Sequence, residues 1–146
     1  MARRVFFSFK YKDVSRAMVV RNSWVVQGKE AAGFIDAAEF EALEKEGDDA
    51  IRRWIDDQLA GTSVTVVLVG SKTCASRWVK YEIKKSKELG HGLLGIDISK
   101  IKDLGGSTSE RCGRIPEGYK FYLWNSEDGY HKMGDWIEGA AKAAGK

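Results

Sequence analysis

Three consecutive segments decide the fold of this chain: the apolar run Val64-Thr65-Val66-Val67-Leu68-Val69, the turn Gly70-Ser71-Lys72-Thr73-Cys74-Ala75-Ser76, and a helix-like segment from Arg77 to Leu89. The apolar run is bounded by turn residues, which is typical of a strand covered on both faces in a parallel sheet. A strand, a polar turn and a helix form half of a β-α-β unit. Ligands of such sheets bind at the carboxyl ends of the strands, so we expect a site near this turn.

The predicted helix carries one acidic residue that its pattern does not explain. At about 100° per residue, the helix has an apolar face and a charged face. The apolar face holds Val79, Ile83, Ser86 and Leu89, and the charged face holds Lys80, Lys84, Lys85 and Glu88. Glu82 projects between Val79 and Leu89, one turn after Trp78. Such a carboxylate must find a partner, face a cavity or take up a proton. Two interpretations stay open: a flanking glutamate that reaches solvent or pairs with an arginine, and a carboxylate that faces a cleft.

The amino-terminal part predicts a first strand at Val5–Phe9, rich in aromatic and β-branched residues. Asp13 is expected to cap a short helix at 14–20. Asn22 and Trp24 follow, close in sequence to the carboxyl end of the strand. They are interpreted either as the lining of a pocket or as a capped helix end with Trp24 buried in the core.

The rest of the chain alternates between predicted helices and strands. Residues 25–40 are interpreted as a loop with short elements, including a short strand Gly33–Asp36. Residues 37–45 have a helix-forming composition but a poor apolar face. The further expected elements are a helix from Asp48 to Gly61, a strand 92–98, a loop 99–118, an edge strand 119–124 and a helix with an apolar stripe from Met133 to Ala144. This order predicts one α/β domain over 1–146, doubly wound, with a mainly parallel sheet and helices on both faces.

The composition is that of a soluble domain: 146 residues, 43% hydrophobic and 31% charged, with a formal net charge of +3. This weak charge gives no reason to expect nucleic acid or a membrane surface as a partner. No stretch is apolar enough to span a bilayer, and the amino terminus does not have the pattern of a signal peptide. Cys74 and Cys112 lack metal-ligand spacing, so we expect a reduced, cytoplasmic protein without a metal site.

Four segments resemble the TIR-like family of ThsB, from the Thoeris antiphage defence system. They are Arg4-Val5-Phe6-Phe7-Ser8-Phe9, Val19-Val20-Arg21-Asn22-Ser23-Trp24, Thr62-Ser63-Val64-Thr65 with Val67-Leu68-Val69-Gly70, and Trp78-Val79-Lys80-Tyr81-Glu82-Ile83. The resemblance covers residues 3–98 and implies a flavodoxin-like fold.

The resemblance also implies an enzyme that uses NAD as its substrate and needs no cofactor. It would cleave the bond between nicotinamide and ribose and cyclise ADP-ribose into a signal that activates a ThsA-like effector. Self-assembly or a phage protein would trigger it. The W-x-x-x-E motif of the family maps onto Trp78 and Glu82, so Glu82 is the expected catalytic residue. The expected substrate-binding residues are Phe6, Ser8, Phe9, Asn22, Trp24, Asp36, Ser71 and Trp78.

Two other hypotheses stay open. In the first, the chain is a TIR-like interaction module without catalysis, in which Glu82 pairs with a basic residue. In the second, it is a nucleoside deoxyribosyltransferase-like enzyme, which also relies on a glutamate, although the usual motifs of that class are not evident. A G-x-G-x-x-G motif is missing after the first strand, so a dehydrogenase-type dinucleotide site is not expected.

Overall fold

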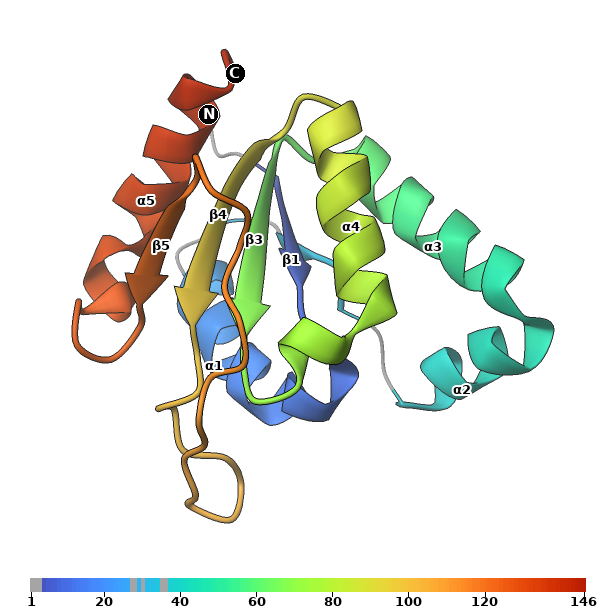
Figure 1. The fold of residues 1–146 in the computed structure, drawn as a ribbon, viewed down its shortest axis with the longest axis horizontal. Coiled ribbons are helices and arrows are strands. Elements are labelled where there is room, and N and C mark those ends of the chain that lie inside the picture. Colours follow the sequence, from blue (N-terminus) through green and yellow to red (C-terminus); the bar gives the residue numbers. More distant parts are fainter. Residues whose placement is uncertain (1–3, 27–28, 30, 35–36) are drawn as a thin grey trace.

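A computed structural model describes residues 4–26, 29, 31–34 and 37–146. Its strands form one sheet in the order β2-β1-β3-β4-β5, and all four neighbouring pairs are parallel. The strands are β1 (Val5–Ser8), β2 (Ala31–Ala32), β3 (Val64–Val69), β4 (Gly92–Asp97) and β5 (Lys120–Leu123). The predicted α/β, flavodoxin-like, doubly wound architecture is confirmed (Figure 1).

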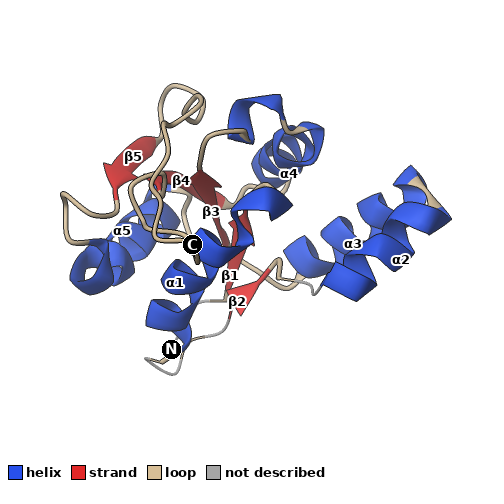
Figure 2. Ribbon diagram, turned by 90° about the horizontal axis from the view of Figure 1, so that it is seen from below, coloured by secondary structure: helices blue, strands red, loops and turns tan. Residues whose placement is uncertain are grey.

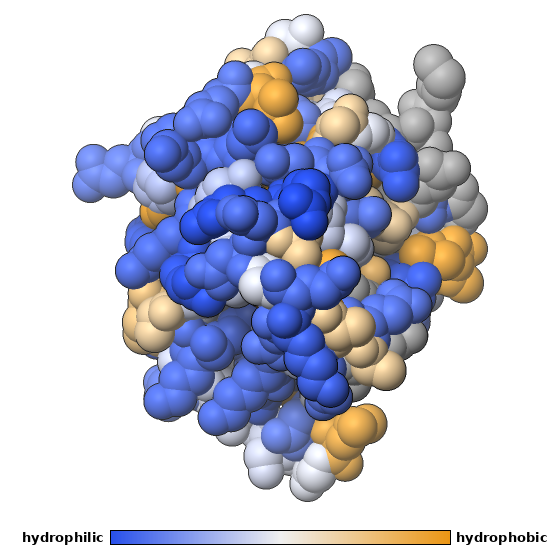
Figure 3. Space-filling view, turned by 90° about the vertical axis from the view of Figure 1, so that its right-hand side faces the viewer, coloured by the Kyte–Doolittle hydropathy of each residue, from blue (hydrophilic) through white to orange (hydrophobic). Residues whose placement is uncertain are grey.

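Helices cover both faces of this sheet (Figure 2). The helices are α1 (Val14–Val25), α2 (Ala37–Glu46), α3 (Asp48–Ala60), α4 (Arg77–Glu88) and α5 (Gly129–Ala143), with two single turns, η1 (Tyr11–Asp13) and η2 (Thr73–Ala75). Helices α1 and α5 pack on the face to which Val5 and Phe7 point, whereas α3 and α4 pack on the face to which Phe6 points. The side of the molecule that α2 and α3 form is mostly hydrophilic, with isolated apolar residues (Figure 3).

The amino-terminal third differs most from the prediction. Helix α1 continues to Val25 instead of ending near Val20, and α2 is a regular helix where a loop with short elements was expected. The short strand is Ala31–Ala32, because Gly33 has φ +93° and bends the chain against the Phe7 carbonyl. Asp36, the expected carboxylate at its end, lies outside the described residues.

Asp13 does not cap α1 with its side chain, contrary to the prediction. The η1 turn buries its carboxylate against Gly70, where it forms an ion pair with Arg16 at 3.4 Å. The pKa of Asp13 is raised above its ordinary value, because the effect of burial is larger than the opposing effect of the positive charge of Arg16. The guanidinium also donates to the carbonyls of Ile101 and Ser107, at 2.7 and 2.9 Å. Asp13 and Arg16 therefore hold the loop that follows β4.

Cys74 and Cys112 are joined by a disulfide, with 5.4 Å between their Cα atoms. The expectation of reduced cysteines is therefore wrong for this structure. The backbone N–H of Cys112 also donates to the Gly70 carbonyl at 2.9 Å. Both contacts tie the 99–118 loop to the turn after β3, which is the turn that leads into α4.

The closing elements follow the prediction. The edge strand β5 pairs with β4, and Met133, Ile137 and Ala141 of α5 are buried in the core, although Ala144 is exposed. None of the helices within the described residues is long and apolar enough to cross a membrane.

Candidate functional site

A cavity of about 460 Å³ opens at the carboxyl end of β1. Here the chain leaves β1 toward one face of the sheet and leaves β3 toward the other, which is the arrangement that creates a ligand-binding crevice in doubly wound folds. The lining residues come from the segment after β1, from α2 and α3, and from the start of α4. They are Phe9, Lys10, Tyr11, Lys12, Gly33, Phe40, Leu43, Glu44, Ile51, Trp54, Ile55, Ala75, Ser76, Arg77, Trp78 and Glu82.

Glu82 lies at the inner wall of this cavity with 6% of its surface exposed. The Ser8 hydroxyl donates a hydrogen bond of 2.6 Å to Glu82 Oε1. Burial raises the pKa of Glu82 to about 8, and the hydrogen bond from Ser8 opposes part of that rise. A carboxyl group with this pKa is mostly protonated at neutral pH. Because its partner is a serine and it faces a cavity, the geometry favours the cleft-facing interpretation over the surface ion pair.

Helix α4 holds Glu82 through contacts at its start and in its middle. The Ser76 hydroxyl caps the helix by accepting a hydrogen bond of 3.3 Å from the Val79 N–H. The buried Ser86 hydroxyl donates to the Glu82 carbonyl at 2.7 Å and pairs with the Thr65 hydroxyl of β3 at 2.7 Å. These bonds fix the turn of α4 that carries Glu82 against β3.

Flat aromatic rings form much of the cavity wall. Tyr11 and Phe40 stack with their centroids 5.2 Å apart and their planes 1° apart, and Trp54 and Trp78 are half-buried. The Arg77 guanidinium lies 4.6 Å from the Trp78 ring centroid. Rings of this kind offer stacking surfaces for a planar base.

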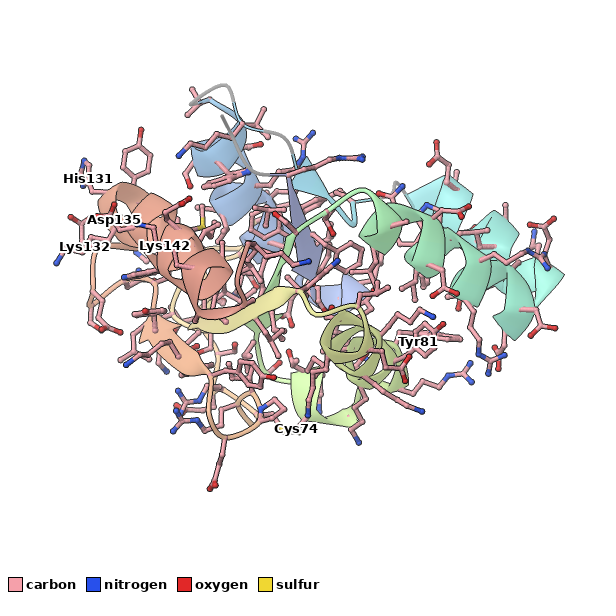
Figure 4. All side chains as sticks on the ribbon, turned by 90° about the horizontal axis from the view of Figure 1, so that it is seen from above. Cys74, Tyr81, His131, Lys132, Asp135 and Lys142 are labelled. Carbon is pink, nitrogen blue, oxygen red and sulfur yellow. A yellow bond between two sulfur atoms is a disulfide. The ribbon has the colours of Figure 1, made fainter. Side chains whose placement is uncertain are left out.

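Tyr81 supports this wall from behind. Its ring meets Trp78 edge-on at 6.2 Å, and its hydroxyl donates to Asp56 of α3 at 2.7 Å. Burial and the Asp56 carboxylate raise the pKa of Tyr81 to about 12, so it stays protonated as a donor. Figure 4 shows Tyr81 between α4 and α3.

The structure brings together several of the predicted site residues. Phe9, Trp78 and Glu82 line the cavity, and Ser8 contacts Glu82 directly. Phe6 is fully buried in the core cluster that contains Ile51 and Ile55, so it supports the cavity wall from beneath. Ser71 is half-buried in the turn after β3 and is not among the lining residues.

Asn22 and Trp24 do not line this cleft, and that expectation is wrong. Trp24 is 2% exposed in the core cluster with Phe7 and Val20, so the sheet separates it from Glu82. Asn22 is exposed on α1. The cause is the greater length of α1, which carries both residues along the α1 face of the sheet. The alternative interpretation of Trp24 as a core residue is confirmed.

Five lining residues were not predicted as site residues: Lys10, Tyr11, Lys12, Phe40 and Arg77. The first three follow β1 directly, so their position at a strand's carboxyl end was a usable signal. Trp54 lies in the predicted helix from Asp48 to Gly61, where helical periodicity cannot separate a core-facing indole from one at a cavity edge. Phe40 belongs to α2, which was not predicted as a regular helix.

Comparisons with known proteins concern the sequence and the fold of the chain. The model of a family described as "Thoeris protein ThsB, TIR-like domain" matches residues 6–103. The protein "Putative cyclic ADP-D-ribose synthase ThsB1" of Bacillus cereus (strain MSX-D12) is 44% identical over 142 residues, which cover 95% of this chain and 73% of that protein. A solved structure, the TIR domain of the Toll-related receptor TRR-2 from Hydra magnipapillata, has a TM-score of 0.60 at 10% identity. It covers 94% of this chain and 97% of that one, and its likeness concerns the fold alone.

Proposed function

Because the chain belongs to the family of Thoeris ThsB proteins with a TIR-like domain, we propose that it cleaves NAD between nicotinamide and ribose and cyclises the ADP-ribose part. The observation that carries this proposal is the buried carboxyl group of Glu82, which faces an aromatic cavity and contacts Ser8. The name of the Bacillus cereus relative, "Putative cyclic ADP-D-ribose synthase ThsB1", supports the same reaction.

The proposed chemistry uses the ionised form of Glu82. As nicotinamide leaves as a neutral molecule, positive charge builds on the ribose, and a nearby carboxylate stabilises that charge. The raised pKa of Glu82 keeps its carboxyl group neutral before NAD binds. The positive charge of the bound nicotinamide ring favours the carboxylate, so NAD binding would lower the pKa of Glu82 and release its proton to water. The Ser8 hydroxyl would then hold the carboxylate in position.

The rest of the cavity suits the other parts of NAD. The stacked Tyr11–Phe40 pair and the indoles of Trp54 and Trp78 offer surfaces for the nicotinamide and adenine rings. Lys10 and Lys12 line the cavity and bring positive charge for the pyrophosphate. A volume of about 460 Å³ is within the range of ligand pockets. Cyclisation requires that water stays away from the ribose, a role that we assign to Trp78 and its neighbours.

The product would act as a messenger. We propose that the cyclic nucleotide activates a separate ThsA-like effector protein, so the two proteins communicate through a small molecule. Synthesis would begin on infection, through self-assembly or a phage protein.

The test compares Glu82→Gln with Glu88→Gln, the same substitution on an exposed residue of the same helix. Nicotinamide release from NAD is measured with purified protein and in lysates of phage-infected cells, together with mass spectrometry of the products. We expect Glu82→Gln to lower the rate by at least about a hundredfold, the scale of losing one preorganised electrostatic group. Glu88→Gln should keep the wild-type rate.

Other outcomes separate the competing hypotheses. Wild-type protein that releases no nicotinamide in any state, including infected lysates, would favour a non-catalytic interaction module. Base exchange on deoxynucleosides with no action on NAD would favour a deoxyribosyltransferase. A Glu82→Gln variant as active as wild type would remove Glu82 from the mechanism.

A further inference from the structure

A second groove lies at the opposite edge of the sheet, where β4 and β5 begin and where α4 and α5 end. Its volume is about 500 Å³. Figure 4 looks onto this edge. The lining residues are Lys87, Gly90, His91, Gly92, Leu93, Gly118, Tyr119, Lys120, Tyr122, Gly139, Ala140, Ala143 and Ala144. The cavity at Glu82 lies at the carboxyl ends of the strands, so the two sites share no lining residue.

Small residues form the floor of this groove. Gly92 packs so closely on α5 that a Cβ atom there would lie 2.7 Å from the Ala140 carbonyl oxygen. Gly139, by contrast, has nothing within 4 Å of the position of a Cβ atom. The floor is therefore a shallow surface of backbone and methyl groups, open enough to admit a small molecule.

His91 gives the groove an unsatisfied polar group. The side chain is 8% exposed, and its Nδ1 has no hydrogen-bond partner among the described residues. Buried polar atoms of folded proteins nearly always have a partner, which makes this imidazole unusual. The unpaired Nδ1 is itself shielded from solvent, so a ligand in the groove would meet the other edge of the ring. Burial, together with the nearby positive charge of Lys146, lowers the pKa of His91 and keeps the ring neutral.

The charged side chains that line the groove are all positive among the described residues. Lys87 and Lys120 line it, and its described lining contains no carboxylate. The charge of Lys146 also reaches His91. A ligand that entered this groove would gain from carrying negative charge, because charge-assisted hydrogen bonds to lysine are stronger than neutral ones.

We propose that this groove binds a small anionic molecule, with its oxyanion between Lys87 and Lys120, a hydrogen bond to the His91 imidazole, and its apolar part over Ala140, Ala143 and Ala144. Tyr122, which stacks on Trp136 of α5, adds ring surface beside the apolar part. This site is independent of the proposed reaction at Glu82.

The chain provides an internal control, because it contains two histidines. His91 lines the groove, whereas His131 is exposed on α5 with its Nδ1 2.9 Å from Asp128 Oδ1 (Figure 4). The purified protein is titrated with AMP, and separately with inorganic phosphate, while the imidazole nitrogens are followed by NMR. We expect AMP to shift the His91 nitrogens and the amides of Gly90 and Gly118, and to leave His131 unchanged.

The two probes distinguish which part of the ligand matters. Shifts with both probes mean that the phosphate group alone is enough for binding. Shifts with AMP alone mean that binding also needs the adenosine part. No shift at His91 with either probe at millimolar concentration would overturn the proposal, as would shifts confined to the cavity at Glu82.

A charge-matched pair of variants completes the test. Lys87→Gln with Lys120→Gln should weaken AMP binding by about tenfold or more, the scale of losing a charge-assisted contact. Lys132→Gln with Lys142→Gln removes two exposed charges from α5 outside the groove (Figure 4) and should leave AMP binding unchanged. Equal weakening in both pairs would show only a general charge effect. Glu82→Gln should not affect binding here, so failure of the groove and failure of the proposed reaction are distinguishable.

Discussion

Ser8 and Glu82 are 74 positions apart in sequence, and the fold brings them into a hydrogen bond. Ser8 ends β1, which pairs with β3, and β3 leads into the helix that carries Glu82. The amphipathic pattern of α4 was enough to identify Glu82 as unusual, because the pattern depends only on neighbouring residues. Its partner was not predictable in this detail, because the contact depends on the order of the strands and on the packing of α4. Trp24 was misplaced for a related reason, since the sequence does not fix where α1 ends.

The buried carboxyl of Glu82 predicts a pH-dependent stability. Its pKa is raised from 4.5 to about 8 in the folded protein. Between these values the unfolded chain has lost the proton and the folded chain keeps it, so rising pH favours unfolding. Relative to Glu82→Gln, the wild type should lose about 1.4 kcal/mol of unfolding free energy per pH unit in this interval. Urea denaturation of both proteins from pH 5 to 8 measures the difference, and parallel curves would contradict a raised pKa.

Ser8→Ala should move the activity profile. The hydrogen bond from Ser8 lowers the pKa of Glu82, so its loss should raise that pKa further. If the carboxylate is the active form, kcat/KM for NAD rises with pH, and its inflection should move up by about one pH unit or more. Ser23→Ala removes another buried serine, on α1, and serves as the control. The same inflection in Ser8→Ala and wild type would show that Ser8 does not tune Glu82.

Among the elements, the strands β3 and β4 and the amphipathic helices were predictable. The strands are short apolar runs bounded by turn residues, and the helices repeat their apolar residues at helical spacing. Helix α2 was not predictable, since its apolar face is poor and it is covered mainly by α3, with Leu43 reaching the cluster around Ile51 and Ile55. Asp13 was predicted as a cap from its position alone. The nearby Arg16 and the tight η1 turn decide its contacts instead.

The contact between α5 and β4 can be tested with two glycines. Gly92→Ala places a methyl group 2.7 Å from the Ala140 carbonyl oxygen and should lower the unfolding free energy by about 1–3 kcal/mol. Gly139→Ala lies within α5 with open space around it, and should raise the unfolding free energy by about 0.5–1 kcal/mol. Chemical denaturation measures both. Equal effects would mean that α5 shifts freely on the sheet.

At the scale of the whole molecule, the disulfide closes a long segment. Cys74 and Cys112 are 38 positions apart and join the turn after β3 to the loop after β4. In the chain-entropy model a link of this span stabilises the folded state by about 3–4 kcal/mol. Denaturation with and without reductant should show this difference, and Cys112→Ala should match the reduced wild type. A mass spectrum that shows two free thiols in the protein as purified would contradict the bond.

The same loop exposes Lys102 and Leu104 to solvent, the latter almost completely, at 96%. Trypsin that cuts after Lys102 would divide the backbone between the two cysteines. The nicked protein would still migrate as one band in a non-reducing gel, and thiol would release two fragments, one of them carrying both Ser8 and Glu82.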